Sequence, residues 1–304
     1  MLKRLAHPYV LLVLTTLFWS GNIVLGRAIH GQVPPIALSF WRWAIAFALT
    51  LPLALPHFAA QWPLLKGAWR VLLTLGLLGV ACYNTFAYIA LQYTPATNAV
   101  LLNAFIPIAT IVLSYVFLQK KLRTIEWLGV FFSFVGVVSI ICQGQWQLLG
   151  RLQLNVGDLW MLGAVIVWAI YTIGLQWRPA GLNPMLMLAA ITSVGVLALA
   201  PLYAWEMLSQ GKYVQLSVGA LAGIAYTGVF PGFLGYVFYN RAVGEIGANK
   251  ASLFIHLMPV FGILLAVVFL GETLKTYHYF GIALIFTGIY LTTARQAKRS
   301  LAEA

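Results

Sequence analysis

The sequence predicts an all-α membrane protein whose ten transmembrane helices form two five-helix inverted repeats. The chain of 304 residues is 62% hydrophobic and only 8% charged, whereas a soluble domain contains about 25% charged residues. Its long apolar stretches lack the alternation of apolar and polar residues that marks barrel strands. Because a backbone in lipid must satisfy its own hydrogen bonds, these stretches are expected to be helices. The two halves of the chain also match each other in sequence, which predicts the repeat.

Ten segments are long and apolar enough to cross the hydrocarbon core, which takes about 20 residues each. Charged residues bound most of them, and residues 94–97 mark a turn inside the longest uncharged stretch. The first segment is predicted to be retained rather than cleaved as a signal peptide, because its apolar run is long and no small-residue cleavage site ends it. The predicted helices cover about 8–28, 34–56, 69–92, 96–118, 125–142, 156–176, 182–205, 215–240, 249–270 and 276–294.

Lys and Arg residues are distributed unevenly between the two predicted sides of the membrane. The side of the N-terminus carries Lys3, Arg4, Lys66, Arg70, Lys120, Lys121, Arg123, Arg178, Arg241, Lys250, Arg295, Lys298 and Arg299. The other side carries Arg27, Arg151, Lys212 and Lys275. Since cytoplasmic loops are enriched in Lys and Arg, both termini are predicted to be cytoplasmic, in an inner or plasma membrane. The net charge of +12 arises mostly in these short loops, so no nucleic-acid partner is expected.

The two halves of the chain align with each other. The third to fifth predicted helices match the eighth to tenth at an offset of 152 residues (259 − 107), which pairs Pro107 with Pro259. An offset of 149 residues (168 − 19) pairs Trp19 with Trp168. The predicted domains are a first repeat at 1–142, a linker at 143–155, a second repeat at 156–294 and a cytoplasmic tail at 295–304. Because each repeat has an odd number of helices, the second enters the membrane from the opposite side, as in many secondary transporters.

Short motifs in both halves resemble a known family. They are Phe18-Trp19-Ser20-Gly21-Asn22, Arg42 in the second predicted helix, and Phe269-Leu270-Gly271-Glu272-Thr273-Leu274 ahead of Gly281 and Gly288. Together they resemble the EamA family of the drug/metabolite transporter superfamily, and within it most closely the bacterial aromatic amino-acid exporters. The resemblance covers nearly the whole chain. It implies ten helices, a central cavity between the halves and export of metabolites.

The first half departs from the family pattern at one place. Residues 118–122 read Leu-Gln-Lys-Lys-Leu where the family usually has Gly and Glu. Any role that the family's glutamate plays is therefore not expected in this half.

Polar and aromatic residues form stripes along several predicted helices. Polar groups at membrane depth usually face the protein interior or a water-filled cavity, and mixed Asn, Tyr and Trp side chains suit an amphipathic solute. The same residues also occur as interfacial belts or as interhelical hydrogen-bond donors, and this interpretation stays open. The candidate substrate-binding residues are Trp19, Asn22, Arg42, Tyr83, Asn84, Tyr88, Asn103, Trp168, Tyr171, Tyr226, Tyr236, Tyr239 and His256.

Arg42 is the only permanent charge placed deep in a predicted helix, and no Asp or Glu lies within about 20 residues of it. Two hypotheses fit equally well: Arg42 meets the carboxylate of a substrate, or it binds helix-end carbonyls beside the cavity. His256 is the one mid-span group that titrates near neutral pH, and a hydrogen-bonded core histidine is the favoured interpretation. Pro107 and Pro259 are predicted as hinges, with static kinks as the alternative.

Several chemical classes are disfavoured by what the sequence lacks. It contains neither a Gly-x-x-x-x-Gly-Lys-Ser/Thr loop nor a His-Glu-x-x-His motif, and no carboxylate lies mid-span. We therefore predict no enzymatic activity, no metal site and no cofactor. Facilitated or exchange transport fits at least as well as proton coupling.

The predicted function is export of a small amphipathic metabolite, with aromatic amino acids first, by alternating access of a monomer in the lipid bilayer. An exchanger of phosphorylated or sugar-linked metabolites would need several cations in the cavity, and only Arg42 is deep. An intramembrane enzyme would need paired catalytic groups at membrane depth, and the sequence shows none.

Overall fold

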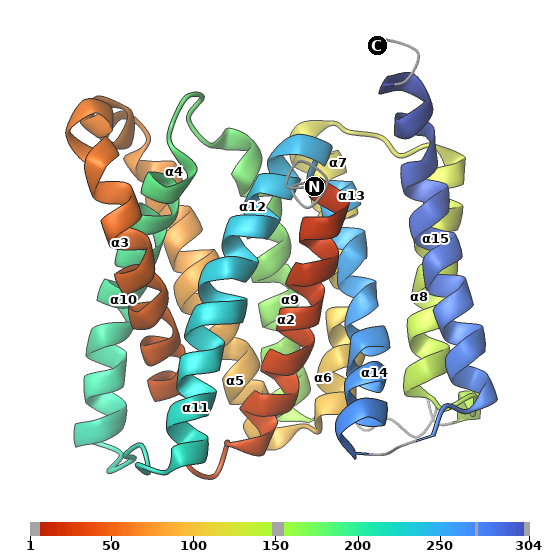
Figure 1. Ribbon diagram of the computed structural model, residues 1–304, viewed down its shortest axis with the longest axis horizontal. Helices are drawn as coiled ribbons and strands as arrows, with labels where there is room; N and C mark the ends of the chain where they lie inside the picture. Colours follow the sequence, from red (N-terminus) through yellow and green to blue (C-terminus); the bar gives the residue numbers. More distant parts are fainter. Residues whose placement is uncertain (1–6, 148–154, 271–272, 301–304) are drawn as a thin grey trace.

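The computed structural model describes residues 7–147, 155–270 and 273–300, and this part of the chain is helical without a β-strand (Figure 1). The prediction of an all-α membrane protein is therefore confirmed. The α-helices are α2 (Pro8–Ala28), α3 (Pro35–Gly67), α4 (Trp69–Leu75), α5 (Tyr83–Tyr93), α6 (Ala96–Asn103), α7 (Ile106–Leu118), α8 (Thr124–Ile141), α9 (Val156–Gly174), α10 (Pro184–Leu208), α11 (Val218–Thr227), α12 (Gly235–Ile246), α13 (Ala248–Leu253), α14 (Met258–Leu270) and α15 (Thr276–Ser300).

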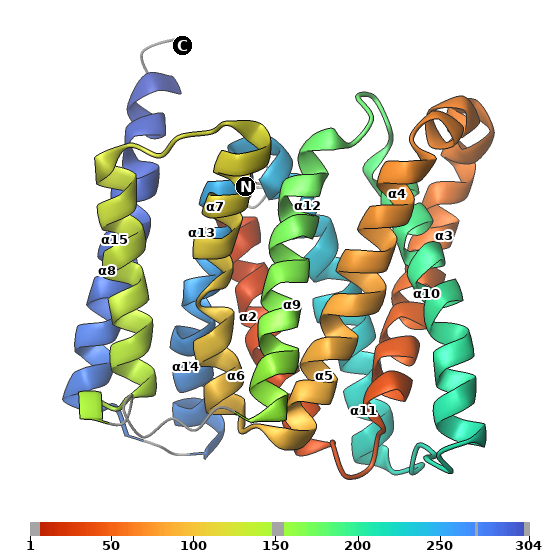
Figure 2. The same cartoon turned by 180° about the vertical axis from the view of Figure 1, so that it is seen from behind.

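Nine helical segments within the described residues are long and apolar enough to cross a membrane. They are Pro8–Ala28, Pro35–Gly67, Trp69–Tyr93, Asn98–Leu118, Thr124–Ile141, Val156–Trp177, Pro184–Leu208, Val218–Ile246 and Ala248–Leu265. The tenth predicted segment forms α15, which lies beside α8 along its length but is not among the nine (Figures 1 and 2). The predicted first repeat, linker and tail each include residues outside the described ranges, namely 1–6, 148–154 and 301–304.

Helix α3 is longer than predicted. The prediction ended it near residue 56, the length that one span needs, but the helix continues through Pro56 and Pro63 to Gly67. Between residues 56 and 67 the sequence has no glycine and no capping residue that would end a helix. The last turns of α3 swing away from the bundle axis (Figures 1 and 2).

Two long helices are interrupted by π-helical turns at corresponding positions in the two halves. The segment η1 (Gly76–Cys82) joins α4 to α5, and η4 (Gly228–Leu234) joins α11 to α12. Their first residues differ by 152 (228 − 76), the offset of the sequence repeat. Such turns change the backbone hydrogen-bond pattern within a helix and frequently occur at functional sites.

The proposed hinge prolines stand at helix restarts rather than in the middle of continuous helices. Helix α6 ends at Asn103 and α7 begins at Ile106, so Pro107 lies in the first turn of α7. A 3-10 turn, η5 (Phe254–Leu257), precedes α14, so Pro259 lies in the first turn of α14. Proline is well tolerated there because the first helical N–H groups have no intrahelical acceptor. A kink within one helix was expected at each proline, whereas the structure has a new helix beginning there; the role of the two prolines as hinges stays a prediction.

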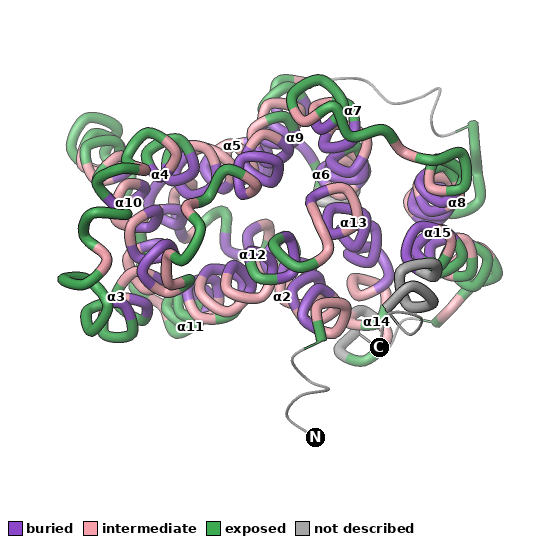
Figure 3. The backbone as a smooth tube through the Cα atoms, turned by 90° about the horizontal axis from the view of Figure 1, so that it is seen from above, coloured by how far each residue is buried: buried purple, intermediate pink, exposed green. Residues whose placement is uncertain are grey.

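Glycines bring α8 and α15 into close contact. A Cβ atom added at Gly136 would lie 2.6 Å from the backbone oxygen of Gly281, and one added at Gly129 would lie 2.6 Å from that of Gly288. Small residues spaced seven apart on both helices thus allow the two backbones to approach. Seen from above, α8 and α15 form a pair at one end of the bundle (Figure 3).

We expect Gly136→Ala to lower the midpoint of thermal unfolding. The added methyl group must displace backbone, and overpacking costs about 1–3 kcal/mol. The matched control is Gly262→Ala in α14, where an added Cβ meets nothing within 4 Å. Unfolding of both variants in the same detergent, followed by circular dichroism, makes the comparison. Equal midpoints would contradict close packing of α8 on α15.

Candidate functional site

A cluster of aromatic side chains fills the centre of the bundle, and Trp168 of α9 stands in its middle. Trp168 is 1% exposed, and its repeat mate Trp19 meets it edge-on at a centroid distance of 5.0 Å. The other ring centroids near Trp168 are those of Tyr83 at 4.5 Å, Tyr171 at 5.0 Å, Tyr239 at 5.3 Å and Tyr236 at 5.5 Å. The structure thus brings together six of the predicted residues from α2, α5, α9 and α12, which we call the central cluster.

Arg42 of α3 is buried and hydrogen-bonded only to neutral groups. Its Nη1 donates to Asn22 Oδ1 at 2.8 Å and to the Tyr88 hydroxyl at 3.2 Å, and its Nη2 donates to the Pro231 carbonyl at 3.1 Å. The guanidinium also lies 5.1 Å from the ring centroid of Trp43. No carboxylate among the described residues pairs with Arg42.

The central cluster contacts both π-helical turns through backbone carbonyls. Trp19 Nε1 donates to the Pro231 carbonyl of η4 at 3.2 Å, the same oxygen that accepts from Arg42. The Tyr236 hydroxyl donates to the Gly79 carbonyl of η1. Gly79 and Pro231 differ by the repeat offset of 152 (231 − 79). Corresponding carbonyls of the two halves therefore hold side chains of the same cluster.

A tyrosine–asparagine pair occurs once in each half with the residue types exchanged. The Tyr88 hydroxyl donates to Asn22 Oδ1 at 2.7 Å, and the Tyr171 hydroxyl donates to Asn240 Oδ1 at 2.7 Å. Asn22 and Tyr171 are repeat mates at an offset of 149 (171 − 22), and Tyr88 and Asn240 at 152 (240 − 88). Only the first pair is joined by a cation, Arg42.

Several buried polar atoms around the cluster have no hydrogen-bond partner among the described residues. They include three donors, Arg42 Nε, Trp43 Nε1 and Asn240 Nδ2. Buried polar groups are nearly always hydrogen-bonded, so these donors are suited to bind a group that supplies acceptors. A carboxylate is such a group, since it carries acceptor oxygens only.

Two predicted residues lie apart from the cluster. His256 is fully buried, with Nε2 at 2.9 Å from the Ala104 carbonyl and Nδ1 at 2.6 Å from Ser133 Oγ. A carbonyl only accepts, so Nε2 carries the proton and Ser133 donates to Nδ1. His256 thus satisfies the geometry of a core histidine. Tyr226 is half-buried and donates to the Phe18 carbonyl at 3.1 Å.

Trp43 and Asn240 belong to the site but were not among the predicted residues. Trp43 follows Arg42 directly and packs edge-on against Tyr236, with the ring centroids 4.6 Å apart. Its position beside the only deep cation was the available signal. Asn240 was detectable as the repeat mate of Tyr88.

Comparison with known proteins decides the family. The model of the EamA-like transporter family matches residues 7–142 and 155–294. This chain belongs to the EamA-like transporter family. Its relatives are named as transporters, so it is a membrane transporter and not an enzyme.

Curated relatives of this EamA-family protein match it over nearly its whole length. The uncharacterized transporter YyaM of Bacillus subtilis is 27% identical over 92% of each chain. A probable terminal-alkyne amino-acid exporter of Streptantibioticus cattleyicolor is 24% identical over 97% of this chain and 96% of its own. A solved structure, described only as the crystal structure of a protein, superposes with a TM-score of 0.74 at 20% identity and covers 96% of this chain and 98% of its own. That structure shares the fold.

A polar cavity of about 650 Å³ opens in this EamA-family chain at the end of the bundle where α2 ends and α3 begins. Its lining includes His30, Gln92, Glu206 and Lys212. Gln92 lies one helical turn beyond Tyr88 on α5, so the cavity comes within one turn of the Asn22–Tyr88 pair. The Glu206 carboxylate accepts from the backbone N–H groups of Ile36 at 3.2 Å and Ala37 at 2.7 Å, which anchors the first turn of α3.

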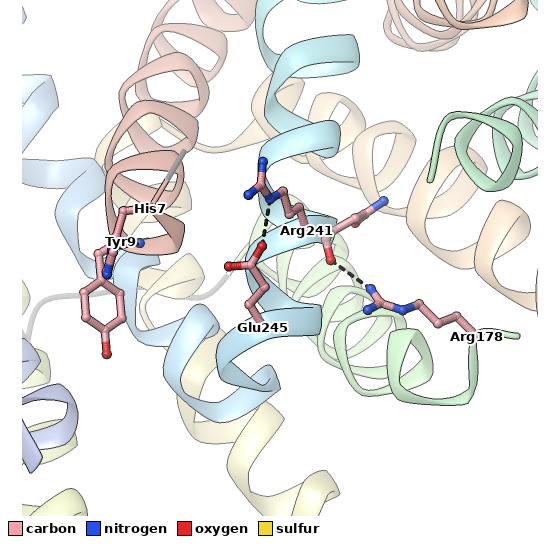
Figure 4. Close-up of polar contacts among 6 residues, drawn as sticks. His7, Tyr9, Arg178, Arg241 and Glu245 are labelled. Atoms are coloured by element: carbon pink, nitrogen blue, oxygen red, sulfur yellow. Dashed lines mark hydrogen bonds and ion pairs between the residues drawn. The ribbon is translucent and has the colours of Figure 1, made fainter. Parts of the chain in front are cut away.

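Arginines at helix ends of this transporter bind backbone carbonyls. Arg178 Nη1 donates to the Asn240 carbonyl at 3.2 Å, next to the exposed Arg241–Glu245 ion pair (Figure 4). Arg27 Nη1 donates to the Leu91 carbonyl at 2.6 Å. Leu91 lies in the last turn of α5, where the helix dipole is negative and favours a cation.

Proposed function

We propose that the protein is a secondary transporter that exports small amphipathic carboxylates, with aromatic amino acids first. The observation that carries the proposal is Arg42, a buried cation without an acidic partner at the edge of an aromatic cluster. A buried guanidinium paired only with neutral groups retains a large desolvation cost, and an anion would offset it.

The surroundings of Arg42 fit an aromatic amino acid in both of its parts. The unpartnered donors of Arg42 and Trp43 would meet carboxylate oxygens. The rings of the central cluster would stack on an aromatic side chain, which is worth about 0.5–1.5 kcal/mol for each pair beyond area burial. The relative named as a probable amino-acid exporter supports the same substrate class.

The charge of the site argues against an exchanger of phosphorylated metabolites. A phosphate carries about two negative charges and is usually held by several cations. Among the buried residues of the described chain, Arg42 is the one permanent cation. A sugar-linked or phosphorylated metabolite therefore ranks behind an amino acid as the candidate substrate.

The proposed mechanism is alternating access by two inverted repeats of five spans each. The π-helical turns and the helix breaks before Pro107 and Pro259 recur at the repeat offset of 152, and the family model matches the chain in two successive stretches. We take α15 as the tenth span because it runs beside α8 (Figures 1 and 2). The helix breaks at Pro107 and Pro259 then serve as hinges of a monomeric carrier.

Counterflow in proteoliposomes tests the function. Vesicles loaded with unlabelled phenylalanine, tyrosine or tryptophan should accumulate the radiolabelled amino acid transiently, whereas protein-free vesicles should not. Parallel loading with leucine, glucose and a sugar phosphate tests the alternatives. Accumulation with the sugar phosphate alone would replace the amino-acid proposal by that of an exchanger.

Labelling of single cysteines in whole cells tests the topology. We expect a membrane-impermeant maleimide to label Lys275→Cys from outside and to spare both Lys120→Cys and a cysteine appended after Ala304. Lys275 precedes α15, and Lys120 lies in the connection between α7 and α8, which is at the opposite end of the bundle from the start of α15 (Figure 1). Labelling of the appended cysteine from outside would contradict the proposal that α15 is a tenth span.

A further inference from the structure

An apolar groove of about 540 Å³ runs down the outside of the bundle between α3, α4 and α10. None of the residues that line it belongs to the central cluster. Aliphatic and aromatic side chains form nearly all of its walls, and Lys66 is the one charged residue that lines it. Five large hydrophobic residues of the groove are exposed, namely Leu55, Phe58, Trp62, Trp69 and Leu73.

The bent end of α3 forms the roof of this groove and is held by defined hydrogen bonds. Gln61 Nε2 donates to the Gly181 carbonyl at 3.1 Å, and Gln61 Oε1 accepts from Asn183 N–H at 2.8 Å. These two bonds tie the end of α3 to the loop before α10. The two helices that flank the groove are therefore joined at this end.

Cations stand at the roofed end of the groove. Lys66 lines it, and the Arg70 guanidinium lies 5.4 Å from the ring centroid of Trp69, which also lines it. Neither cation forms an ion pair with a carboxylate of the described chain. Arg70 in addition lines a second, smaller apolar cavity of about 260 Å³ on the other side of α4.

We propose that this groove binds one anionic phospholipid, with an acyl chain in the groove and the phosphate at Lys66 and Arg70. The two cavities on either side of α4 offer a place for each of the two acyl chains of one lipid molecule. Along α10 the lining runs from Leu186 to Val194, about 12 Å at 1.5 Å per residue. That length is close to half of the 30 Å hydrocarbon core, the depth of one leaflet.

The chemistry at the rim distinguishes an anionic lipid from other occupants. Tryptophan side chains such as Trp62 and Trp69 are enriched at the level of the lipid headgroups. Lys and Arg beside them attract anionic headgroups. A second copy of this chain would have to bring carboxylates to Lys66 and Arg70. Among the described residues, Asp158 and Glu206 are buried, Glu126 accepts from the backbone N–H of Arg123, and Glu245 pairs with Arg241.

Native mass spectrometry of purified protein tests the proposal with an equimolar mixture of phosphatidylglycerol and phosphatidylcholine of the same acyl chains. We expect the parent protein to retain phosphatidylglycerol preferentially. The double variant Lys66→Gln, Arg70→Gln should lose this preference by roughly fivefold or more, since each cation near anionic lipid contributes about fivefold. The matched control is Lys120→Gln, Lys121→Gln, which removes the same charge from the same end of the bundle, outside the groove.

A second variant addresses the acyl chain. Ala190→Trp places a bulky side chain in the groove wall and should reduce retention of both lipids while leaving the charge preference of the remainder unchanged. Equal retention of the two lipids by the parent, or an equal loss in the Lys120 and Lys121 control, overturns the proposal. A dimer without retained lipid, dissociated by Ala190→Trp, would overturn it in favour of a second copy of the chain.

Discussion

Replacing Arg42 by glutamine should reduce phenylalanine counterflow by at least tenfold while the protein remains folded. The substitution removes the only buried permanent cation of the described chain, together with its hydrogen bonds to Asn22 and Pro231. A hydrogen bond to a charged group contributes about 1.5–3 kcal/mol, which corresponds to about tenfold to a hundredfold. The reduced transport should come from lost recognition of the substrate carboxylate.

A pair of substrates separates recognition from structure. The parent should prefer phenylalanine over phenylalanine amide, which lacks the carboxylate, and the Arg42→Gln variant should lose that preference. Arg27→Gln is the matched control, because Arg27 also donates to a helix carbonyl but lies outside the central cluster. If Arg42→Gln kept the preference, or if Arg27→Gln lost it equally, Arg42 would be a structural residue that only binds the Pro231 carbonyl.

The helices of this protein were largely readable from the sequence because membrane spans are governed by simple rules. Length, apolar content and flanking charge located the start of α2 and the turn before α6. The end of α3 was missed because the prediction stopped at the length that one span needs, whereas the helix continues through Pro56 and Pro63, as helices in a membrane tolerate proline. The π-helical turns η1 and η4 were also missed, since no residue pattern distinguishes them from α-helix within an apolar run.

The interior positions of the candidate residues were predictable from the sequence, but their contacts were not. The stripe of Trp19 and the stripe of Trp168 predicted an interior position, and the repeat offset predicted that the two tryptophans correspond. Which side chains bind each other depends on how the helices are rotated and tilted, and a sequence stripe leaves that open. The exchange of Tyr and Asn between the pairs Asn22–Tyr88 and Asn240–Tyr171 is an example, because alignment of identical residues overlooks it.

The aromatic cluster and the cation together predict a substrate with two distinct ends. The exchanged Tyr–Asn pairs give the halves similar shapes, but only the first half contributes Arg42. A symmetric site would bind a solute equally well in either direction along the pseudo-symmetry axis. Under the proposed function, the single cation would orient a substrate carboxylate towards the first half and leave the ring to Trp168 and its neighbours.

Replacing Trp168 by alanine should weaken the binding of aromatic amino acids about tenfold and leave that of leucine nearly unchanged. Trp168 contacts five other aromatic rings of the cluster, and stacking pairs are worth about 0.5–1.5 kcal/mol each. Half-saturation concentrations for tryptophan and leucine, measured by uptake into proteoliposomes, give the comparison. Trp168→Phe retains a ring and should lie between the parent and the alanine variant.

The same substitution must be separated from loss of stability, because a buried tryptophan replaced by alanine costs about 3–5 kcal/mol of unfolding free energy. Uptake is therefore measured well below the unfolding midpoint of the variant. Trp146→Ala is the control, since Trp146 is 48% exposed in the segment between the two halves. An equal loss for leucine and tryptophan would indicate collapse of the cluster rather than a lost stacking partner. Tryptophan binding by Trp168→Ala at the parent level would place the aromatic part of the substrate outside the central cluster.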